Sequence, residues 1–522
     1  MSLEERTTSH MVNTLQKDLP LSRSFIWNLQ AKYYQSLGID AWLSGMVPSR
    51  VTTNSYIAWR YARLIASYIQ DTQARNVTIV ELGAGHGRFG FLTATHLQQI
   101  AAEMLPQHTT WKYVLTDCAE RNIQFYEAHE AFQPLVSEGR VDFARYEAGV
   151  DHSLTLRHSG ELIDATNPAE HLIVIGNYFF DSLPMDVWHV KNGELSAFWP
   201  VIHARDSGSM FTQEQVDVLE HLDLEWEHKE TTPAYSDPLW NAIATQLATE
   251  IQNGTFMLPV GAFACLDELN SWSHRPMFLL VTDKGYPRVE DYQDRGPPTL
   301  IQHGCFSFNL NFVALEKWFE SKSGFAHLPK YRDGLIETAA FATHFHKGSL
   351  ASTQFEFSAV TQFTPAEFHQ VTRRCENAGP DLFTALSFLK LSCYDPITLH
   401  RLRRSIRNGI PDADSIEINL LYDALIHVRQ NFYHLRDFDI PFDLGLIYQH
   451  LSNYDIAIDL YHESLRLFGE RGITFYNLAI CHEKLGRPAQ ALHCIDKSIA
   501  IDPDTDALEF RTKLQLSNLL PS

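Results

Sequence analysis

Short apolar runs alternate with longer amphipathic stretches between about residues 76 and 360 of the 522-residue chain. Such runs are typical of buried parallel strands, whereas apolar positions spaced three and four residues apart indicate helices. The expected strands cover residues 77–82, 112–116, 172–175 and 277–282, and the clearest expected helices cover residues 89–105 and 119–132. Because consecutive parallel strands need right-handed crossovers, the pattern predicts a doubly wound α/β sheet.

A different composition interrupts this alternation between residues 191 and 272, where Glu, His and Trp are frequent. We expect an inserted, mostly helical cap there. Open α/β sheets bind ligands at the carboxyl ends of their strands, so such a cap could cover an acceptor. The segment before the first strand, residues 1–75, is expected to be helical, and the α/β domain is expected to span residues 76–365.

Helical patterns alone continue after about residue 364, which predicts a second, all-α domain over residues 366–522. Within it, Leu444 recurs as Leu478 and Ala457 as Ala491, a period of 34 residues. This is the tetratricopeptide period, and its small residues would let two antiparallel helices approach closely. Because two units rarely stand alone, residues 381–436 are expected to add divergent repeats. A generic helical bundle is the alternative.

Net charge, apolar runs and cysteine spacing indicate which partners and which cellular compartment to expect. The formal net charge of -21 opposes binding to nucleic acid or anionic lipid, and no run approaches the ~18 apolar residues of a membrane span. The seven cysteines are odd in number and never spaced as C-x-x-C, so we expect a reducing compartment. The amino terminus lacks the features of a signal peptide. These observations predict a soluble cytoplasmic protein.

A glycine-rich turn follows the first expected strand, in the sequence V-T-I-V-E-L-G-A-G-H-G-R-F-G at residues 77–90. Gly83, Gly85 and Gly87 would let the backbone turn sharply and approach a ligand, and the following helix would present free N–H groups. Arg88 stands where a dinucleotide-binding motif has its third glycine. The motif therefore favours a ligand other than NAD.

Two carboxylates accompany this turn. Glu81 lies just before the glycines, where it suits a cationic ligand group better than a pyrophosphate, since two anions repel each other. Asp117 ends the second expected strand, where a carboxylate can accept both hydroxyls of a ribose. The predicted cofactor-binding residues are therefore Glu81, Gly83, Gly85, Gly87 and Asp117. In the alternative interpretation the glycines only form a tight turn and Asp117 only caps the next helix.

The motif E-L-G-A-G-H-G with Asp117 resembles the cofactor half of class I S-adenosylmethionine-dependent methyltransferases, which have a Rossmann-like sheet. More narrowly, H-L-I-V-I-G-N-Y-F-F-D-S-L-P at residues 171–184 resembles the N-E-F-F-D-A-L-P signature of the MidA-like methyltransferases. That family includes the mitochondrial complex I assembly factor that methylates a protein arginine. T-D-K-G-Y at 282–286 and N-L-N-F-V-A-L at 309–315 resemble two further motifs of the family. The resemblance covers roughly residues 50–360 and implies S-adenosylmethionine as cofactor.

The sequence departs from the family signature mainly on the acceptor side. Tyr178 stands where the family has Glu, and Lys284 where it has Tyr. Cys305 and Asn309 replace an Asp and a His of the family pattern. A neighbouring carboxylate is what would orient a guanidinium through paired hydrogen bonds. These departures therefore weaken the expectation of an arginine acceptor but leave methyl transfer itself in place.

Asn177 and Asp181 follow the strand at 172–175 and are the predicted catalytic residues. They would lie at the carboxyl edge of the sheet, where the acceptor must meet the methyl donor. Asp181 would orient the acceptor or take its proton, and Asn177 would make a polar contact to donor or acceptor. In the alternative interpretation Asp181 caps the next helix.

No metal site is expected. His344 and His346 share one face of a strand-like run, but no Cys or carboxylate nearby completes a ligand set. His86, inside the glycine turn, is a candidate contact to the carboxylate end of the cofactor. Methyl transfer from a sulfonium demands alignment, exclusion of water and, for many acceptors, removal of a proton, but it demands no metal.

These observations predict an S-adenosylmethionine-dependent methyltransferase domain joined to tetratricopeptide-like repeats that bind a protein substrate or partner. A protein side chain is the expected acceptor. One alternative is a scaffold that keeps the methyltransferase fold without catalysis and works through its repeats. A nicotinamide-dependent oxidoreductase is a third hypothesis, opposed by Arg88 and Glu81.

Overall fold

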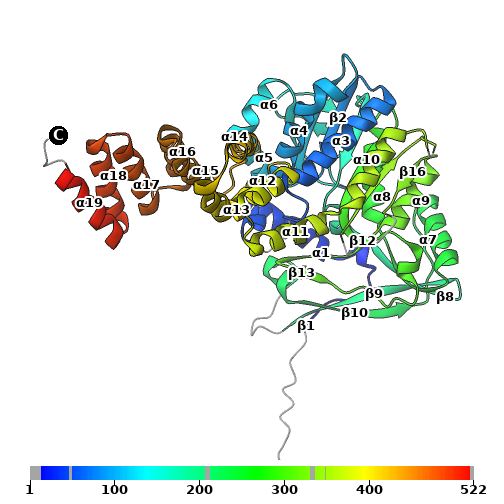
Figure 1. Ribbon diagram of the computed structural model, residues 1–522. Coiled ribbons are helices and arrows are strands. Elements are labelled where there is room, and N and C mark those ends of the chain that lie inside the picture. Colours follow the sequence, from blue (N-terminus) through cyan, green and yellow to red (C-terminus); the bar gives the residue numbers. More distant parts are fainter. Residues whose placement is uncertain (1–12, 46–49, 206–211, 330–335, 347, 518–522) are drawn as a thin grey trace, which may run out of the picture. The chain divides into compact units, whose positions relative to one another are not determined.

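The computed structural model describes residues 13–45, 50–205, 212–329, 336–346 and 348–517. The chain divides into two compact units, which are described separately. Unit 1 comprises residues 1–53 and 57–368, and unit 2 comprises residues 54–56 and 369–522. Unit 1 contains the predicted α/β sheet, and unit 2 is made of helices (Figure 1).

The central sheet of unit 1 has the strand order β16-β17-β12-β7-β2-β3-β4, with β15 paired to β12. The first five parallel strands in the chain are β2 (Asn76–Glu81), β3 (Thr110–Asp117), β4 (Val141–Arg145), β7 (His171–Ile175) and β12 (Phe278–Tyr286). Beyond β12 lie β17 (Ile336–Ala342) and β16 (Phe325–His327), each antiparallel to its neighbour, and β15 (Leu310–Asn311). The predicted doubly wound sheet is confirmed.

Helices cover both faces of this sheet (Figure 1). On one face, Tyr68 of α3 (Ser55–Thr72) stacks on Phe278 of β12, with ring centroids 4.4 Å apart. On the other face, the adjacent residue Leu279 shares a buried cluster with α8 (Val260–Ser271) and α9 (Phe312–Ser321). Successive side chains of a strand point to opposite faces, so the apolar run of β12 is buried from both sides. The remaining helices of unit 1 that flank the sheet are α4 (Arg88–Met104), α5 (Glu120–Ala128), α6 (Gln133–Ser137) and α10 (Ala351–Gln362).

The segment 191–272 differs from the predicted mostly helical cap. It supplies most of a five-stranded sheet with the order β1-β9-β8-β11, in which β10 also pairs with β9. The strands are β1 (Asn13–Gln16), β8 (Asp186–Lys191), β9 (Glu194–Ala204), β10 (Leu222–Lys229) and β11 (Asn253–Leu258), and α7 (Pro238–Ile251) precedes β11. The correction has a physical reason in β10, L-D-L-E-W-E-H-K, where apolar and polar positions alternate with the period of a strand. Its charged residues suggested a helix, whereas their spacing is that of a sheet with one face in contact with water.

The N-terminal part of unit 1 begins with β1 and continues with helices, and residues 1–12 lie outside the described residues. Its helices are α1 (Ile26–Leu37) and α2 (Asp40–Leu43). Ile26 and Leu29 of α1 are buried in a cluster with Ile202 of β9 and Phe306. The antiparallel sheet therefore packs against α1.

Unit 2 consists of consecutive helices. They are α11 (Pro365–Ala378, which begins in unit 1), α12 (Leu382–Leu391), α13 (Pro396–Gly409), α14 (Ser415–Gln430), α15 (Ile440–His450), α16 (Tyr454–Phe468), α17 (Gly472–Lys484), α18 (Pro488–Ile501) and α19 (Thr505–Ser517). The predicted all-α region is confirmed. A Cβ atom on Gly445 would lie 2.7 Å from the ring of Tyr461, so α15 and α16 approach closely only because this position has no side chain. Divergent repeats over residues 381–436 stay a prediction.

None of the helices formed by the described residues combines the length and the apolar character needed to cross a bilayer.

Candidate functional site

The glycine turn connects β2 to α4 with an unusual backbone. Gly83, Gly85 and Gly87 have φ of 61°, 60° and 78°, in the left-handed region that residues with a Cβ rarely adopt. A Cβ on Gly83 would lie 3.0 Å from the ring of Phe179, and one on Gly85 would lie 3.0 Å from the ring of Trp42. The glycines are therefore required by conformation and by space. Gly87 is the residue before α4 and, unlike the other two, does not line the cavity described below.

Asp117 ties this turn to the end of β3. Its Oδ2 accepts a hydrogen bond from the Gly85 N–H at 3.0 Å, and its Oδ1 accepts one from the Ala119 N–H at 2.9 Å, just before α5. Burial raises the pKa of the Asp117 carboxyl. Asp117 binds the N–H of Ala119, the residue before α5, but α5 has no side-chain cap, so the capping role of the alternative interpretation is not observed. Asp117 also lines the cavity.

Glu81 is buried at the end of β2, where the exposed fraction of the residue is 5%. Its Oε2 accepts a hydrogen bond from the Tyr113 hydroxyl at 3.0 Å. Removal from water, and secondarily the nearby Asp117, raise the pKa of Glu81 to about 8. At neutral pH the carboxyl is thus poised between its neutral and charged forms, and a cation in the cavity would favour the charged form.

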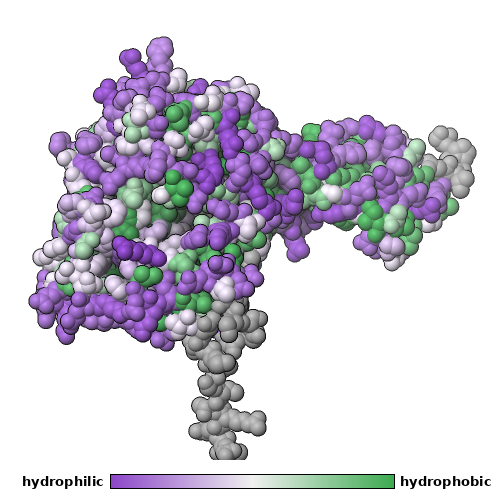
Figure 2. Space-filling model, turned by 180° about the vertical axis from the view of Figure 1, so that it is seen from behind, coloured by the Kyte–Doolittle hydropathy of each residue, from purple (hydrophilic) through white to green (hydrophobic). Residues whose placement is uncertain are grey.

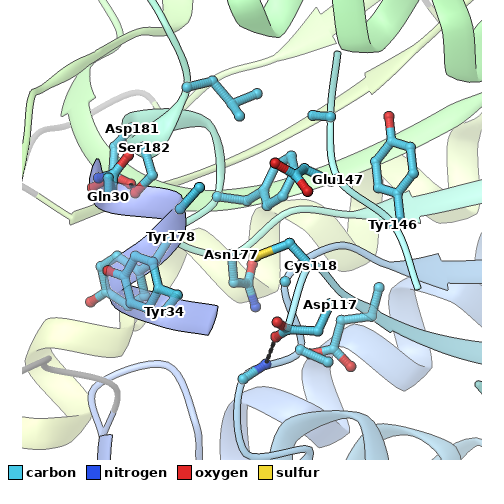
Figure 3. Close-up of a pocket in the computed structure, with 18 of the residues that line it drawn as sticks. Gln30, Tyr34, Asp117, Cys118, Tyr146, Glu147, Asn177, Tyr178, Asp181 and Ser182 are labelled. Atoms are coloured by element: carbon cyan, nitrogen blue, oxygen red, sulfur yellow. Dashed lines mark hydrogen bonds between the residues drawn. The ribbon is translucent and has the colours of Figure 1, made fainter. Parts of the chain in front are cut away.

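One cavity of about 430 Å³ connects these residues with the predicted catalytic residues. It lies at the carboxyl ends of β2, β3 and β7 and is lined by residues from several elements (Figure 3). Six of the seven predicted site residues line it: Glu81, Gly83, Gly85, Asp117, Asn177 and Asp181. The structure therefore brings both predicted groups to one site, as expected for strand ends that meet at one edge of a sheet.

Asn177 lies in Figure 3 between the Asp117 side and the Asp181 side of the cavity. Its Oδ1 accepts hydrogen bonds from the Tyr61 hydroxyl at 2.8 Å and from the Thr282 N–H at 3.0 Å. Its Nδ2 is buried and has no hydrogen-bond partner among the described residues. Because an unsatisfied buried donor is costly, this amide is a candidate donor to a ligand.

Asp181 lies on the short 3-10 turn after β7, where its residue exposure is 2%. Its Oδ1 accepts a hydrogen bond from the Ser182 hydroxyl at 2.9 Å, and its N–H donates to Asp283 Oδ2 at 3.1 Å. Asp283, at the end of β12, also accepts from the Lys284 N–H at 2.8 Å. The chain continues into β8 after this turn, so Asp181 has no following α-helix to cap.

The two carboxyls share their environment. Burial raises the pKa of Asp181 and of Asp283, and the proximity of Asp181 raises that of Asp283 further. Lys284 acts in the opposite direction on both. Two buried carboxyls that interact in this way resist carrying two negative charges at once.

Tyr178 has a φ of 51° although it carries a side chain. Its N–H donates to the Thr282 carbonyl at 3.0 Å, which holds the backbone between β7 and β12 in this conformation. Such strain in a bulky residue persists only where the surroundings impose it, and it is concentrated at functional sites. The conformation places Tyr178 on the wall of the cavity next to Asn177.

The N-terminal helices form a wall of the cavity that the sequence analysis missed. Trp27, Gln30 and Tyr34 come from α1, and Trp42 comes from α2. The rings of Tyr34 and Trp42 are stacked, with centroids 5.6 Å apart. The density of aromatic and amide residues in W-N-L-Q-A-K-Y-Y was the available signal, but nothing in the sequence placed this helix over the sheet.

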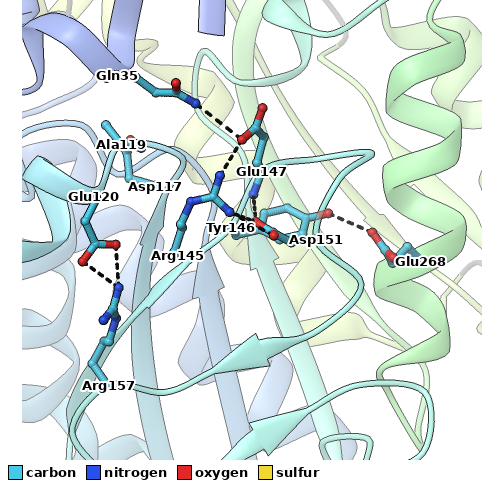
Figure 4. Close-up of polar contacts among 10 residues, drawn as sticks. All are labelled: Gln35, Asp117, Ala119, Glu120, Arg145, Tyr146, Glu147, Asp151, Arg157 and Glu268. Carbon is cyan, nitrogen blue, oxygen red and sulfur yellow. Dashed lines mark hydrogen bonds and ion pairs between the residues drawn. The ribbon is translucent and has the colours of Figure 1, made fainter. Parts of the chain in front are cut away.

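A second missed wall follows β4 (Figure 4). Glu147 lines the cavity, and its Oε2 accepts hydrogen bonds from Arg145 at 2.6 Å and from Gln35 at 3.5 Å. Its N–H donates to Asp151 Oδ2 at 2.8 Å, and Arg145 also binds Asp151. This network fixes a carboxylate on the wall adjacent to Asp117. Because β4 was not among the expected strands, the position of Glu147 could not be expected either.

The described residues contain no group of three His, Cys, Asp or Glu side chains arranged to hold a metal ion. His303 lines the cavity, and burial together with the nearby Lys284 lowers its pKa to about 4, so it is neutral at physiological pH. The histidine in the glycine turn, His86, also lines the cavity, and its Nδ1 accepts from the Arg88 N–H at 3.3 Å.

Two segments of the chain match known protein families. Residues 61–304 match the family described as "Putative S-adenosyl-L-methionine-dependent methyltransferase", and residues 439–504 match the tetratricopeptide repeat. No curated protein gives a significant match. These matches confirm the predicted enzyme class, cofactor and repeat type, and they oppose the nicotinamide hypothesis. They do not bear on the narrower MidA-like resemblance or on the acceptor.

Two solved structures from Burkholderia thailandensis are similar to this chain at low identity. One, bound to S-adenosyl-homocysteine, is 14% identical with a TM-score of 0.37, over 63% of this chain and 95% of that chain. The other, an uncharacterized superfamily protein, is 14% identical with a TM-score of 0.34, over 79% of this chain and 82% of that chain. At these scores neither carries an argument about function. By the family matches, residues 61–304 form an S-adenosylmethionine-dependent methyltransferase domain, and residues 439–504 are tetratricopeptide repeats.

Proposed function

We propose that this protein transfers a methyl group from S-adenosylmethionine to a protein side chain, and that its helical repeats bind the protein that carries it. The observation that supports this proposal is the single cavity that joins the glycine turn and Asp117 to Asp181. A donor bound against the turn and an acceptor bound near Asp181 would share one enclosed space. Alignment of two reactants in such a space is the main contribution that a methyltransferase must make.

The residues present fit the cofactor. The two glycines with left-handed φ leave space at the turn that a Cβ would fill, Asp117 offers a carboxylate to ribose hydroxyls, and the Asn177 Nδ2 is an unpaired buried donor. Glu81 would meet positive charge in its ionised form. When bound, S-adenosylmethionine supplies a methyl group activated by the positive charge of its sulfur.

The chain's own residues would then orient the acceptor and exclude water. Asp181, which accepts a hydrogen bond from Ser182 and whose N–H donates to Asp283, would contact the acceptor. The aromatic wall of Trp27, Tyr34 and Trp42 would keep water away from the reacting atoms. Asn177 would stay fixed through Tyr61 and Thr282 and offer its amide to donor or acceptor.

An arginine acceptor, which the narrower resemblance implies, is less well supported. Lys284 lines the same cavity, and its ammonium would repel a guanidinium. The positions of Tyr178, Cys305 and Asn309 add no carboxylate in compensation. The proposed acceptor is therefore a protein side chain, and arginine is not favoured.

The direct test is incubation of the purified protein with labelled S-adenosylmethionine and a protein extract. We expect label in protein, and we expect S-adenosyl-homocysteine to inhibit the reaction. Calorimetry on the same preparation would show whether the cofactor binds. Cofactor binding without any labelled product from any extract would favour the alternative, a scaffold that keeps the fold without catalysis.

Replacing Gly85 by Val should weaken binding of S-adenosylmethionine by more than tenfold. The new side chain would start 3.0 Å from the Trp42 ring, at a φ of 60°, and would fill the space above the turn. Isothermal calorimetry would measure the effect. Gly160→Val is the matched control, because Gly160 also has a positive φ of 71° but nothing within 4 Å of its Cβ position. Equal affinity in Gly85→Val and wild type would show that the ligand does not use this turn.

The proposed partner-binding role of the repeats is based on exposed apolar side chains of α16 to α19, namely Ile456, Ile473, Ile501, Leu508 and Leu516. Figure 2 shows hydrophobic surface on the helical unit. Exposed apolar patches are typical of protein interaction sites. A chain ending at residue 368 should keep cofactor affinity and lose labelling of its protein substrate. If it labels the same proteins equally well, the repeats do not recruit the substrate.

A reducing, cytoplasmic environment is part of the same proposal. All seven cysteines lie among the described residues, and each of them is a free thiol. Localisation of the tagged full-length chain by microscopy and cell fractionation would test this expectation.

A further inference from the structure

Lys284 is the one lysine or arginine among the described residues that line the cavity. It lies in β12, directly after Asp283. Its Nζ donates a hydrogen bond to the Ser307 hydroxyl at 3.4 Å, and no carboxylate of the described residues lies within 4.0 Å of it. Its other contact is the ring of Tyr178, whose centroid lies 6.0 Å away. A partly buried ammonium whose contacts are a neutral hydroxyl and an aromatic ring has unused capacity to bind an anion.

The two acidic groups near Lys284 act on it without a direct ion pair. Burial raises the pKa of Asp181 and of Asp283, the charge of Lys284 lowers both, and neither carboxyl is within 4.0 Å of its ammonium. His303, whose Nε2 also lies 3.2 Å from the Ser307 hydroxyl, is neutral. Tyr178, whose ring centroid lies 6.0 Å from the Lys284 ammonium, and Ser182 line the same cavity and carry no charge at physiological pH. The acceptor end of the cavity therefore presents an ammonium that has no direct carboxylate partner among the described residues.

We propose that the methyl acceptor is a carboxylate that Lys284 holds in the cavity, so that the product is a methyl ester. This inference deepens the function proposed above and rests on it. The ammonium of Lys284 would bind one carboxylate oxygen. The other oxygen would face the methyl group of the donor bound at the glycine turn.

The chemistry of this acceptor agrees with the groups at the site. A carboxylate oxygen forms a bond to the methyl carbon while the bond between that carbon and sulfur breaks, and the electron pair stays on sulfur. The negative charge of the acceptor and the positive charge of the sulfur are both cancelled. No proton has to be removed, so the reaction needs no ionised base, and the raised pKa of Asp181 and of Asp283 is compatible with it.

Ester formation can be separated from other methylation by its stability. Protein labelled by the full-length chain should lose its label as volatile methanol in mild alkali, and acid hydrolysis should yield no methylarginine or methyllysine. Lys284→Met should reduce labelling by roughly tenfold to a hundredfold, the range expected for loss of one charged hydrogen bond. Its affinity for S-adenosylmethionine, measured by calorimetry, should stay within about twofold of wild type and would also show that the variant is folded.

Two control variants sharpen this result. Lys284→Arg keeps a cation at the site and should retain much more activity than Lys284→Met. Lys191→Met removes an exposed lysine of β8 that does not line the cavity, and it should behave as wild type. Activity in Lys284→Met equal to wild type would remove Lys284 from acceptor binding and overturn the proposal.

The remaining outcomes distinguish this inference from the function on which it rests. Alkali-stable label recovered as methylarginine or methyllysine would overturn the carboxylate acceptor and leave protein methylation in place. Alkali-labile label found only in the small-molecule fraction would support the carboxylate and overturn a protein acceptor. Mapping the esterified peptides would distinguish label on side-chain carboxylates from label on the carboxyl terminus of the substrate protein. Absence of label in every fraction would count against both proposals.

Discussion

Asp181→Asn should reduce methyl transfer by about a hundredfold or more while leaving the affinity for S-adenosylmethionine nearly unchanged. The side chain is buried beside the acceptor end of the cavity and is coupled through its own N–H to Asp283. An amide keeps the shape of the carboxyl but replaces one of its two acceptor oxygens by a donor, so the contacts that position the acceptor change. Losses of about a hundredfold are typical when reactants at such a site are displaced by about 1 Å. Transfer of labelled methyl groups and calorimetric titration with the cofactor would give the two numbers.

The control for this variant is Asp223→Asn, which alters an exposed carboxylate of β10 outside the cavity. It should match wild type in both measurements. If Asp181→Asn instead retained full activity, the carboxyl would have only a structural role in the turn after β7. If it lost cofactor affinity as well, Asp181 would belong to the donor end of the site.

Glu81→Gln should stabilise unit 1 at alkaline pH and have little effect at about pH 5. The pKa of this buried carboxyl is about 8 in the folded chain against 4.5 for an ordinary glutamate. Between these two values the folded state keeps a proton that the unfolded state has lost, so wild-type stability falls as pH rises through this window. Above it the wild type carries a buried carboxylate, and the difference from the neutral glutamine approaches roughly 5 kcal/mol.

Thermal unfolding of both proteins between pH 5 and pH 9 would measure this difference. Because all other titrating groups are the same, subtracting one curve from the other isolates Glu81. Glu103→Gln, an exposed position on α4, should shift stability equally at every pH. A constant difference between Glu81→Gln and wild type across this range would show that Glu81 is ionised in the folded chain at all these pH values. Saturation with the cofactor should also reduce the difference, since a cation in the cavity stabilises the ionised form.

Much of the fold could be predicted because its strands are buried on both faces and are therefore continuously apolar. The strands β2, β3, β7 and β12 were visible for this reason. By contrast, β10 is covered on one side only, and its frequent charged residues led to the wrong expectation of a helix. Amino-acid composition alone was misleading for β10, whereas the alternation of apolar and polar residues in L-D-L-E-W-E indicates a strand.

The site could be predicted only where its residues come from the ends of recognised strands. Glu81, Asp117 and Asn177 each follow or end such a strand, and they do meet in one cavity. Asp283 was visible in the sequence, but its pairing with Asp181 depends on β7 and β12 being neighbours in the sheet. Tyr34 and Trp42 come from helices whose position over the sheet depends on packing against a second sheet that was not foreseen.

That packing also determines when the active site can form during synthesis. Gln30 of the first helix donates to the carbonyl of Phe306 at 2.7 Å, and Thr14 of the first strand lies against His203. The helix that carries Gln30 is synthesised early, but its partner Phe306 is synthesised 276 residues later. This wall of the cavity therefore cannot pack in its final position until then. Contacts so distant in sequence make folding slow and leave early segments exposed. A nascent chain lacking the segment after residue 300 should thus be unable to retain the cofactor, and chaperones would meet the aromatic helix Ile26–Leu37 uncovered.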